Sequence, residues 1–177
     1  MIDNLRYPIG KWAAPQNFSP EIIDAWISDI GSCPYSLEAL ISGLNEEQLG
    51  WKYRPGGWTI RQICHHLADS HMNAYIRHKL TMTEELPTIN PYKEELWAVM
   101  ADVNEVSMKE AVQLLKLIHH RWTIYLKSLL FVELQRAYFH PEKQKRITME
   151  ESIGMYSWHC RHHLGHIELA IRSQIIK

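Results

Sequence analysis

The sequence predicts an all-α protein built as a four-helix bundle. Apolar residues recur at helical spacing in four long segments, a serine or threonine at an N-cap position precedes each segment, and no run alternates convincingly as a β-strand. With 177 residues, of which 46% are hydrophobic, the chain is long enough for one domain with a substantial core. Four amphipathic helices bury their apolar faces against one another, so residues 1–177 are expected to form a single domain.

The first predicted helix follows an N-terminal arm. Residues 1–18 are expected to be extended rather than helical, because Leu5–Gly10 and the prolines near it interrupt any helical pattern. Ser19 then supplies an N-cap, and Pro20 fits the first helical position. This helix is expected to run to about Gly43, where the glycine is typical of a helix end.

The second predicted helix begins at a capping box formed by Thr59 and Gln62 and reaches about Thr81. A connection of about 25 residues, 82–106, follows it and is expected to contain a short helix at Glu94–Met100. This connection is long enough to carry the chain from one end of a bundle to the other. The second and third helices therefore need not be antiparallel neighbours.

The third and fourth predicted helices also begin at capping boxes. Ser107 and Thr148 each stand three residues before a glutamate, and the fourth helix is expected to extend to about Ile171. Residues 139–143 lie between these helices and are expected to form a loop. The predicted apolar face of the third helix consists of Ala111, Leu114, Leu115, Ile118, Trp122, Tyr125, Leu126 and Leu129.

The composition argues against several classes of function. The net charge is −1 and no long run of Lys or Arg occurs, so neither nucleic acid nor an anionic membrane surface is an expected partner. No apolar run has the length of a membrane span or of a signal peptide, and we expect a cytoplasmic protein. Three widely spaced cysteines indicate neither a disulfide framework nor a C-x-x-C metal site.

The eleven histidines are the clearest sign of function. His159 and His163 stand four residues apart on the fourth helix, so their imidazoles lie one turn above each other, the spacing with which a helix chelates a metal. His66 lies on the flank of the apolar stripe of the second helix and is expected to face this pair inside the bundle. These three residues form a candidate three-imidazole metal site.

Both helices also offer a second set of histidines as possible metal ligands. His162 and His166 are also four residues apart, and His65 is the neighbour of His66. The apolar stripe of the fourth helix favours the first pair, whose members lie within about 100° of its centre, whereas His162 lies about 160° away. We therefore expect His65 and His162 to face away from the core. His71, central in the stripe of the second helix, is expected to be a hydrogen-bonded core residue rather than a ligand.

Several segments resemble the DinB/YfiT-like family of small metal-dependent proteins, and its YfiT branch in particular. They are Gly57–His71, Trp158–Ile167, the arm Leu5–Gly10 and the loop Tyr138–Glu142. The resemblance covers essentially the whole chain. It implies an up-down-down-up four-helix bundle, a homodimer, and one divalent metal per chain held by His66, His159 and His163.

One position departs from the pattern of this family. Many of its members have Arg-Gly-Gln after the last ligand, where this chain has Leu164-Gly165-His166. His166 is therefore the candidate catalytic residue, either as a fourth contact to the metal or behind the ligands. We expect its replacement to reduce activity with the metal retained.

The ligand set predicts the chemistry. Three neutral imidazoles leave the charge of a dication uncompensated and one coordination position open, as in catalytic sites. Such a centre lowers the pKa of bound water to about 7 and deprotonates a bound thiol. The resemblance favours a bacillithiol-type S-transferase acting on small electrophiles, and hydrolysis by metal-bound hydroxide is the alternative.

A non-catalytic, metal-stabilised binding or stress-response module is the third hypothesis. Zn is the expected metal in the cell, and Ni is the alternative after recombinant purification, because both suit an all-imidazole set. The expected partner is a small-molecule substrate, which in the transferase hypothesis includes a low-molecular-weight thiol.

Overall fold

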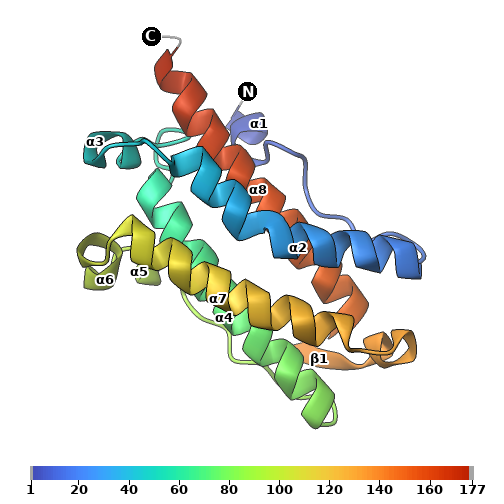
Figure 1. The fold of residues 1–177 in the computed structure, drawn as a ribbon. Coiled ribbons are helices and arrows are strands. Elements are labelled where there is room, and N and C mark those ends of the chain that lie inside the picture. The colour runs from blue at the N-terminus through green and yellow to red at the C-terminus, as the bar shows by residue number, and fades with distance from the viewer. Residues whose placement is uncertain (1, 176–177) are drawn as a thin grey trace.

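The computed structural model describes residues 2–175, so residues 1, 176 and 177 of the expected single domain lie outside the described residues. The bundle consists of the long helices α2 (Pro20–Ile41), α4 (Ile60–Thr83), α7 (Met108–Lys127) and α8 (Met149–Ile175). Figure 1 shows α2 beside α8 and α4 beside α7, and α2 also packs on α7 and α4 on α8. The prediction of an all-α four-helix bundle is confirmed.

The helices run up, down, down and up in chain order. The colours in Figure 1 show α2 and α8 running in one direction and α4 and α7 in the other. Nε of Arg136, shortly after α7, donates to the carbonyl oxygen of Thr81 near the end of α4 at 2.9 Å, so α4 and α7 end on the same side. The long connection between them makes this parallel arrangement possible, because it returns the chain to the opposite end.

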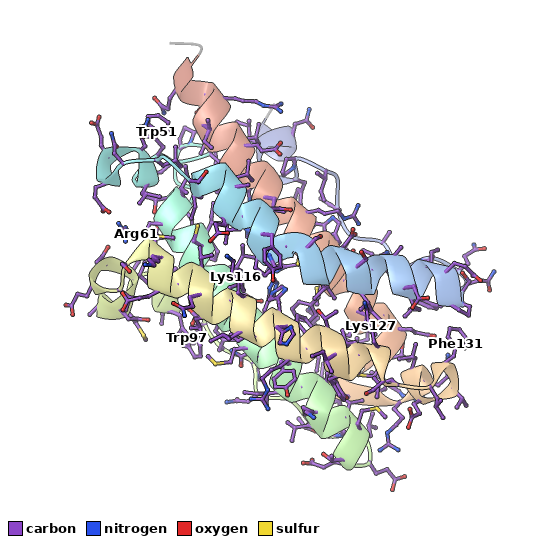
Figure 2. All side chains as sticks on the ribbon, in the orientation of Figure 1. Trp51, Arg61, Trp97, Lys116, Lys127 and Phe131 are labelled. Carbon is purple, nitrogen blue, oxygen red and sulfur yellow. The ribbon has the colours of Figure 1, made fainter. Side chains whose placement is uncertain are left out.

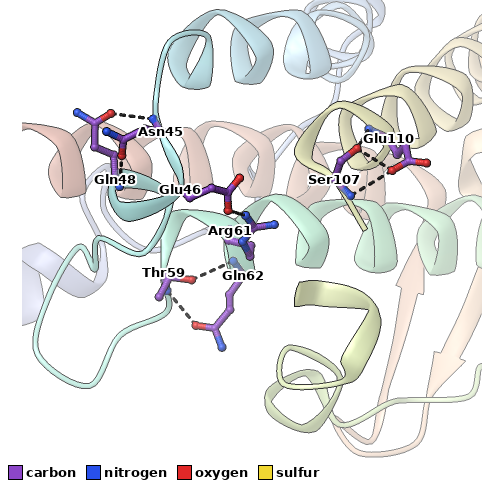
Figure 3. A network of polar contacts seen from close by, with 8 residues as sticks. All are labelled: Asn45, Glu46, Gln48, Thr59, Arg61, Gln62, Ser107 and Glu110. Carbon is purple, nitrogen blue, oxygen red and sulfur yellow. Dashed lines mark hydrogen bonds and ion pairs between the residues drawn. The ribbon is translucent and has the colours of Figure 1, made fainter. Parts of the chain in front are cut away.

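The predicted N-caps are present. The side-chain oxygens of Ser19, Thr59 and Ser107 accept hydrogen bonds from backbone N–H groups of the first helical turn at 3.3, 3.1 and 3.3 Å. Gln62 and Glu110 reach back to the N–H of their own cap residues at 3.0 and 3.1 Å, which completes two capping boxes (Figure 3). Caps of this kind contribute about 0.5–2 kcal/mol each. Because this contribution favours Ser and Thr at the N-cap position, these helix starts can be predicted from the sequence.

Several short elements connect the long helices. They are α1 (Ile2–Arg6), α3 (Glu46–Leu49), α5 (Glu94–Trp97), α6 (Ala101–Glu105), the 3₁₀-helix η1 (Phe131–Gln135), and the strands β1 (Ala137–His140) and β2 (Lys145–Thr148). The predicted short helix at 94–100 corresponds to α5, and α6 follows it. The expectation of a wholly extended arm is wrong, because residues 2–6 form a helix that packs on α8.

The expectation of no strand is also wrong. β1 and β2 pair antiparallel as a hairpin, and Tyr138 and Ile147, which face each other across it, pack with Ile89 in a small satellite core. Each strand has four residues, too few for alternation to be visible in the sequence. Thr148 ends β2 and caps α8, since its Oγ1 accepts from the N–H of Glu151 at 3.3 Å, but the carboxylate of Glu151 pairs with Nζ of Lys145 at 2.6 Å instead of completing the predicted capping box.

The N-terminal arm crosses α8 at two glycines. A Cβ atom at Gly154 would lie 2.7 Å from ring atoms of Trp12 in the arm and of Trp26 in α2, and one at Gly165 would lie 3.1 Å from Cγ of Pro8 in the arm. A side chain at either position would push the arm away from the helix. The small residues of α8 therefore let the arm cover a face that would otherwise be exposed.

The core side of α7 differs from the prediction at three positions, one of which is Val112, buried although it was not predicted to be. Leu114 is 47% exposed, whereas His119 is buried between the core residues Leu115 and Trp122. Lys116, labelled in Figure 2, extends from α7 toward α2. Its Nζ lies 2.6 Å from both carboxylate oxygens of Glu38 in α2. None of the described helices combines the length and apolar character required to cross a membrane.

A buried histidine on α4 predicts a pH dependence of stability. Nε1–H of Trp122 donates to Nδ1 of His78 at 3.1 Å, so His78 carries its proton on Nε2, which donates to Oγ of Ser152 at 2.8 Å. Burial, and then the nearby charge of Arg77, lowers the pKa of His78 to about 3. The folded protein therefore keeps this side chain neutral at pH values where an unfolded chain protonates it.

The contribution of His78 to the free energy of unfolding should be complete above about pH 6.5 and decrease as the pH falls, by about 2 kcal/mol at pH 5. Guanidinium denaturation of the wild type and of His78→Gln at about pH 7.5 and about pH 5 measures this loss. Glutamine keeps one donor and one acceptor but does not titrate, so His78→Gln should lose about 2 kcal/mol less than the wild type. His120→Gln, at an exposed histidine, is the control. An identical pH dependence in the wild type and His78→Gln would contradict this prediction.

Candidate metal centre

Three histidines from α4 and α8 converge on one point. Nε2 of His159 lies 3.3 Å from Nε2 of His66 and 3.1 Å from Nε2 of His163. Within the described part of the chain, these are the residues whose possible ligand atoms all lie within 4.8 Å of one another. The structure thus brings together the three residues that the sequence analysis selected as metal ligands.

Local structure explains this convergence. His159 and His163 lie one turn apart on α8, and α4 packs on α8 so that His66 faces them. Trp58 packs against the ring of His66 with centroids 4.6 Å apart and stacks on His163 at 6.3 Å. Because Trp58 directly precedes the cap residue Thr59, the capping box that starts α4 also fixes the indole against two of the three histidines.

The three nitrogens lie in the wall of a cavity of about 470 Å³, a size typical of small-molecule sites. The N-terminal arm, the loop before α4, the crossover and β1 complete this cavity. Its lining includes aromatic rings and side chains of both charges. The charged ones are Arg6, Arg54, Arg77, Lys143, Glu94, Glu95 and Glu142.

Burial keeps the three imidazoles neutral. It lowers the pKa of His66 to about 4. The pKa values of His159 and His163 are also lowered well below the ordinary value, first by burial and then by neighbouring imidazoles. Neutral imidazole is the form that binds a metal ion. These side chains are therefore in the binding form at neutral pH.

The geometry fits a small divalent ion. A tetrahedral site with Zn–N bonds of about 2.0–2.1 Å holds its ligand nitrogens about 3.3–3.4 Å apart. The Nε2 separations from His159, 3.1 and 3.3 Å, are close to this spacing, and all three possible ligand atoms lie within 4.8 Å of one another. His66, His159 and His163 would supply three such bonds, and the cavity leaves the remaining side open.

Two further histidines lie behind His159. Nδ1 of His159 is 3.0 Å from Nε2 of His71, whose Nδ1 is 2.7 Å from Nε2 of His119. The prediction that His71 is a hydrogen-bonded core residue is confirmed. Sequence reasoning missed His119, although its place among the apolar residues of α7, four residues after Leu115 and three before Trp122, was a visible signal.

His166 lies behind His163 rather than among the three converging nitrogens. Its Nδ1 is 3.4 Å from Nδ1 of His163, and its Nε2 donates to the carbonyl oxygen of Arg6 at 3.1 Å. The ring of Tyr53 stacks on it with centroids 3.9 Å apart. This placement is the second of the two positions considered for His166, a contact behind the ligands, and its part in catalysis stays a prediction.

His65 and His162 are expected to face away from the core, and so to be exposed, but this exposure is not found, since each is 7% exposed. α6 packs on α4, and Asp102 in α6 is close enough to influence the pKa of His65. His162 stacks on Trp158 with centroids 4.4 Å apart and is covered by Tyr7 of the arm. A helical wheel gives the direction of a side chain relative to the bundle, but it omits segments that cover the outside.

Comparison with known proteins places this architecture in a family. The family model described as the DinB superfamily matches residues 32–167. The chain belongs to the DinB superfamily. Two similar relatives are "Putative metal-dependent hydrolase YfiT" of Bacillus subtilis and "Putative metal-dependent hydrolase BcerKBAB4_2443" of Bacillus mycoides. The first is 42% identical over 93% of this chain and 92% of the relative, and the second is 45% identical over 93% and 94%.

A solved structure shares the fold of this DinB-superfamily member. It is YfiT from Bacillus subtilis, described as "a probable metal-dependent hydrolase with an unusual four-helix bundle topology". The two superimpose with a TM-score of 0.93 at 42% identity, over 97% of this chain and 98% of that one. The up-down-down-up order of the helices therefore belongs to a known fold.

Proposed function

We propose that this DinB-superfamily protein is a metal-dependent enzyme that activates a small thiol for transfer to an electrophile. The observation that carries the proposal is the convergence of three neutral imidazole nitrogens, from His66, His159 and His163, at a cavity of about 470 Å³. The names of the relatives from Bacillus support metal dependence.

The three imidazoles would hold a divalent ion such as Zn²⁺ through Nε2. When bound, the ion would supply positive charge that lowers the pKa of a thiol or a water placed on its open side. Trp58 holds the rings of His66 and His163 in place by packing. Tyr53 and Trp158 stand in the cavity wall, where they reduce the access of water to the reacting atoms.

The cavity favours a thiol that arrives as a substrate. Cys33, Cys64 and Cys160 are buried in the core and do not line the cavity, and burial raises the pKa of Cys64 to about 12. Side chains of both charges, such as Arg77 and Glu94, suit a small thiol that carries both an amino group and a carboxylate. In the reaction its sulfur forms a bond to the electrophilic carbon, and the displaced group leaves with the thiol proton.

Hydrolysis is the second candidate. Each of the relatives cited above is named a putative metal-dependent hydrolase, and the same centre would activate water in place of a thiol. The two candidates need the same three histidines and the same metal. They differ in whether turnover requires an added thiol.

A paired assay of the zinc-loaded protein separates these candidates. One series combines cysteine or another small thiol with a chromogenic aryl halide, and the other offers activated esters and amides without thiol. We expect turnover in the first series that depends on thiol concentration and disappears on treatment with a chelator. Zinc added back should restore it.

His163→Ala and His120→Gln are the matched variants for this assay, because the first removes a proposed ligand and the second changes an exposed histidine. Turnover should be lost in the first variant and kept in the second. Chelator-sensitive turnover of esters without thiol would support the hydrolase. Absence of turnover in both series would contradict both enzymatic candidates.

A further inference from the structure

We propose that two chains of buried imidazoles, each ending on a backbone carbonyl, fix the tautomers of His159 and His163 so that both Nε2 lone pairs face the metal site. His71, His119 and His166 are the positioning residues in these chains. The inference rests on the proposed metal centre, and the three positioning residues that it names are not metal ligands. It specifies which ring nitrogen of each histidine carries the proton before any metal binds.

The first chain begins at Ile30 in α2. Its carbonyl oxygen only accepts, so Nδ1 of His119, 2.6 Å away, carries the proton. Nε2 of His119 is then an acceptor, and His71 must donate to it from Nδ1 across 2.7 Å. Nε2 of His71 is in turn an acceptor for Nδ1–H of His159 at 3.0 Å. The proton of His159 therefore lies on Nδ1, and its Nε2 carries a lone pair.

The second chain begins at Arg6 in the N-terminal arm. Its carbonyl oxygen accepts from Nε2–H of His166 at 3.1 Å, which makes Nδ1 of His166 an acceptor. Nδ1 of His163 lies 3.4 Å from this acceptor and is placed to donate to it. His163 then also carries its proton on Nδ1 and a lone pair on Nε2. The arm, about 160 residues away in sequence, thus contacts a proposed ligand through one imidazole.

Both chains require imidazoles with one donor and one acceptor, which is the neutral form. His71, His119 and His166 are each at most 2% exposed, and burying an uncompensated charge is costly. Each link is therefore neutral at pH 7. A protonated link would donate from both nitrogens and would break the sequence of donors and acceptors.

The two chains have a joint consequence at the metal site. They leave lone pairs on two Nε2 atoms that lie only 3.1 Å apart, so no proton of either ring is available to join them by a hydrogen bond. Two facing lone pairs repel each other unless a positive charge lies between them. The polar core therefore prepares His159 and His163 to bind a cation rather than each other.

Nitrogen NMR of the protein labelled with ¹⁵N in its histidine rings tests the assignment directly. Long-range ¹H–¹⁵N spectra distinguish a ring protonated on Nδ1 from one protonated on Nε2. In chelator-treated protein at neutral pH, we expect His159, His163, His71 and His119 to carry the proton on Nδ1 and His166 to carry it on Nε2. Protonation of His159 or His163 on Nε2 in the wild type would overturn the proposal, and this measurement needs no variant.

Crossed variants then test each chain separately. His119→Leu removes the acceptor of His71, so His159 should populate the Nε2–H tautomer while His163 stays unchanged. His166→Leu should do the reverse. Each should weaken Zn²⁺ binding, measured by competition with a chromogenic chelator, by about 10–100-fold, the usual effect of losing a partner of a metal ligand, while still retaining the ion at saturating Zn²⁺. His119→Gln and His166→Gln keep one donor and one acceptor and should restore most of the affinity.

A purely structural role of these residues predicts a different pattern. It would change both tautomers or neither in every variant, and glutamine would not rescue binding, which would overturn the proposal. The test is also distinct from that of the proposed function. Wild-type protein with the predicted tautomers supports the two chains even if no turnover is found, whereas turnover combined with Nε2–H tautomers in the metal-free protein refutes the chains and leaves the enzyme standing.

Discussion

The wild-type protein is expected to bind about one metal ion per chain. Replacing His163 by alanine is expected to abolish this binding. His163 supplies one of three converging nitrogens, and even the loss of an outer partner of a ligand lowers metal affinity by about 10–100-fold. We therefore expect a loss greater than about 100-fold, with His66→Ala and His159→Ala behaving alike. Elemental analysis of the purified variants and competition with a chelator measure the stoichiometry and the affinity.

The adjacent His162 is the matched control for His163. It is buried against Trp158, so truncation to alanine should reduce stability, and His162→Gln retains more of its volume. This variant should keep about one metal ion per folded chain, because none of the three converging nitrogens belongs to it. Metal lost from His162→Gln but retained in His163→Ala would show that the second set of histidines holds the metal.

The parts of the fold that depend on local contacts were predictable from the sequence. Thr59 and Ser107 begin their helices as expected, because a capping box uses residues only three positions apart. The hairpin was not predictable for the opposite reason. Its strands are short, and β1 is supported by a bridge between Thr88 and Phe139, about 50 residues apart in sequence.

The same distinction applies to the candidate site. His159 and His163 could be selected because two histidines four residues apart on one helix share a face. The links of His119 could not be predicted, since its partners are Ile30 on α2 and His71 on α4, and helical periodicity does not specify contacts between helices. The burial of His162 likewise depends on the arm. Local patterns thus predicted the proposed ligands but not the contacts that orient them.

Replacing Trp122 by alanine is expected to produce the largest loss of stability. Trp122 is fully buried, and its ring packs against His71, His78 and His119, the three histidines in the centre of the bundle. Truncation of such a side chain costs about 3–5 kcal/mol. It also leaves Nδ1 of His78 without its donor, which adds to the loss because a buried acceptor remains unpaired. Denaturation by guanidinium in the presence of a chelator measures this effect without a contribution from metal binding.

One further variant separates packing from hydrogen bonding at this position, and one at another tryptophan serves as a control. Trp122→Phe keeps most of the apolar contact but removes the donor to His78, so it should cost about 1–3 kcal/mol, less than the alanine variant. Trp97→Ala, at a partly exposed tryptophan that packs against Tyr92, should cost less than Trp122→Ala because less apolar surface is buried there. If Trp122→Ala were no more destabilising than Trp97→Ala, the prediction that burial of the Trp122 indole is a main source of stability would be wrong. A loss of metal affinity in Trp122→Phe as well would indicate that His78 and the imidazole chain to His159 are coupled through this ring, since the indole contacts His71 and His78 directly.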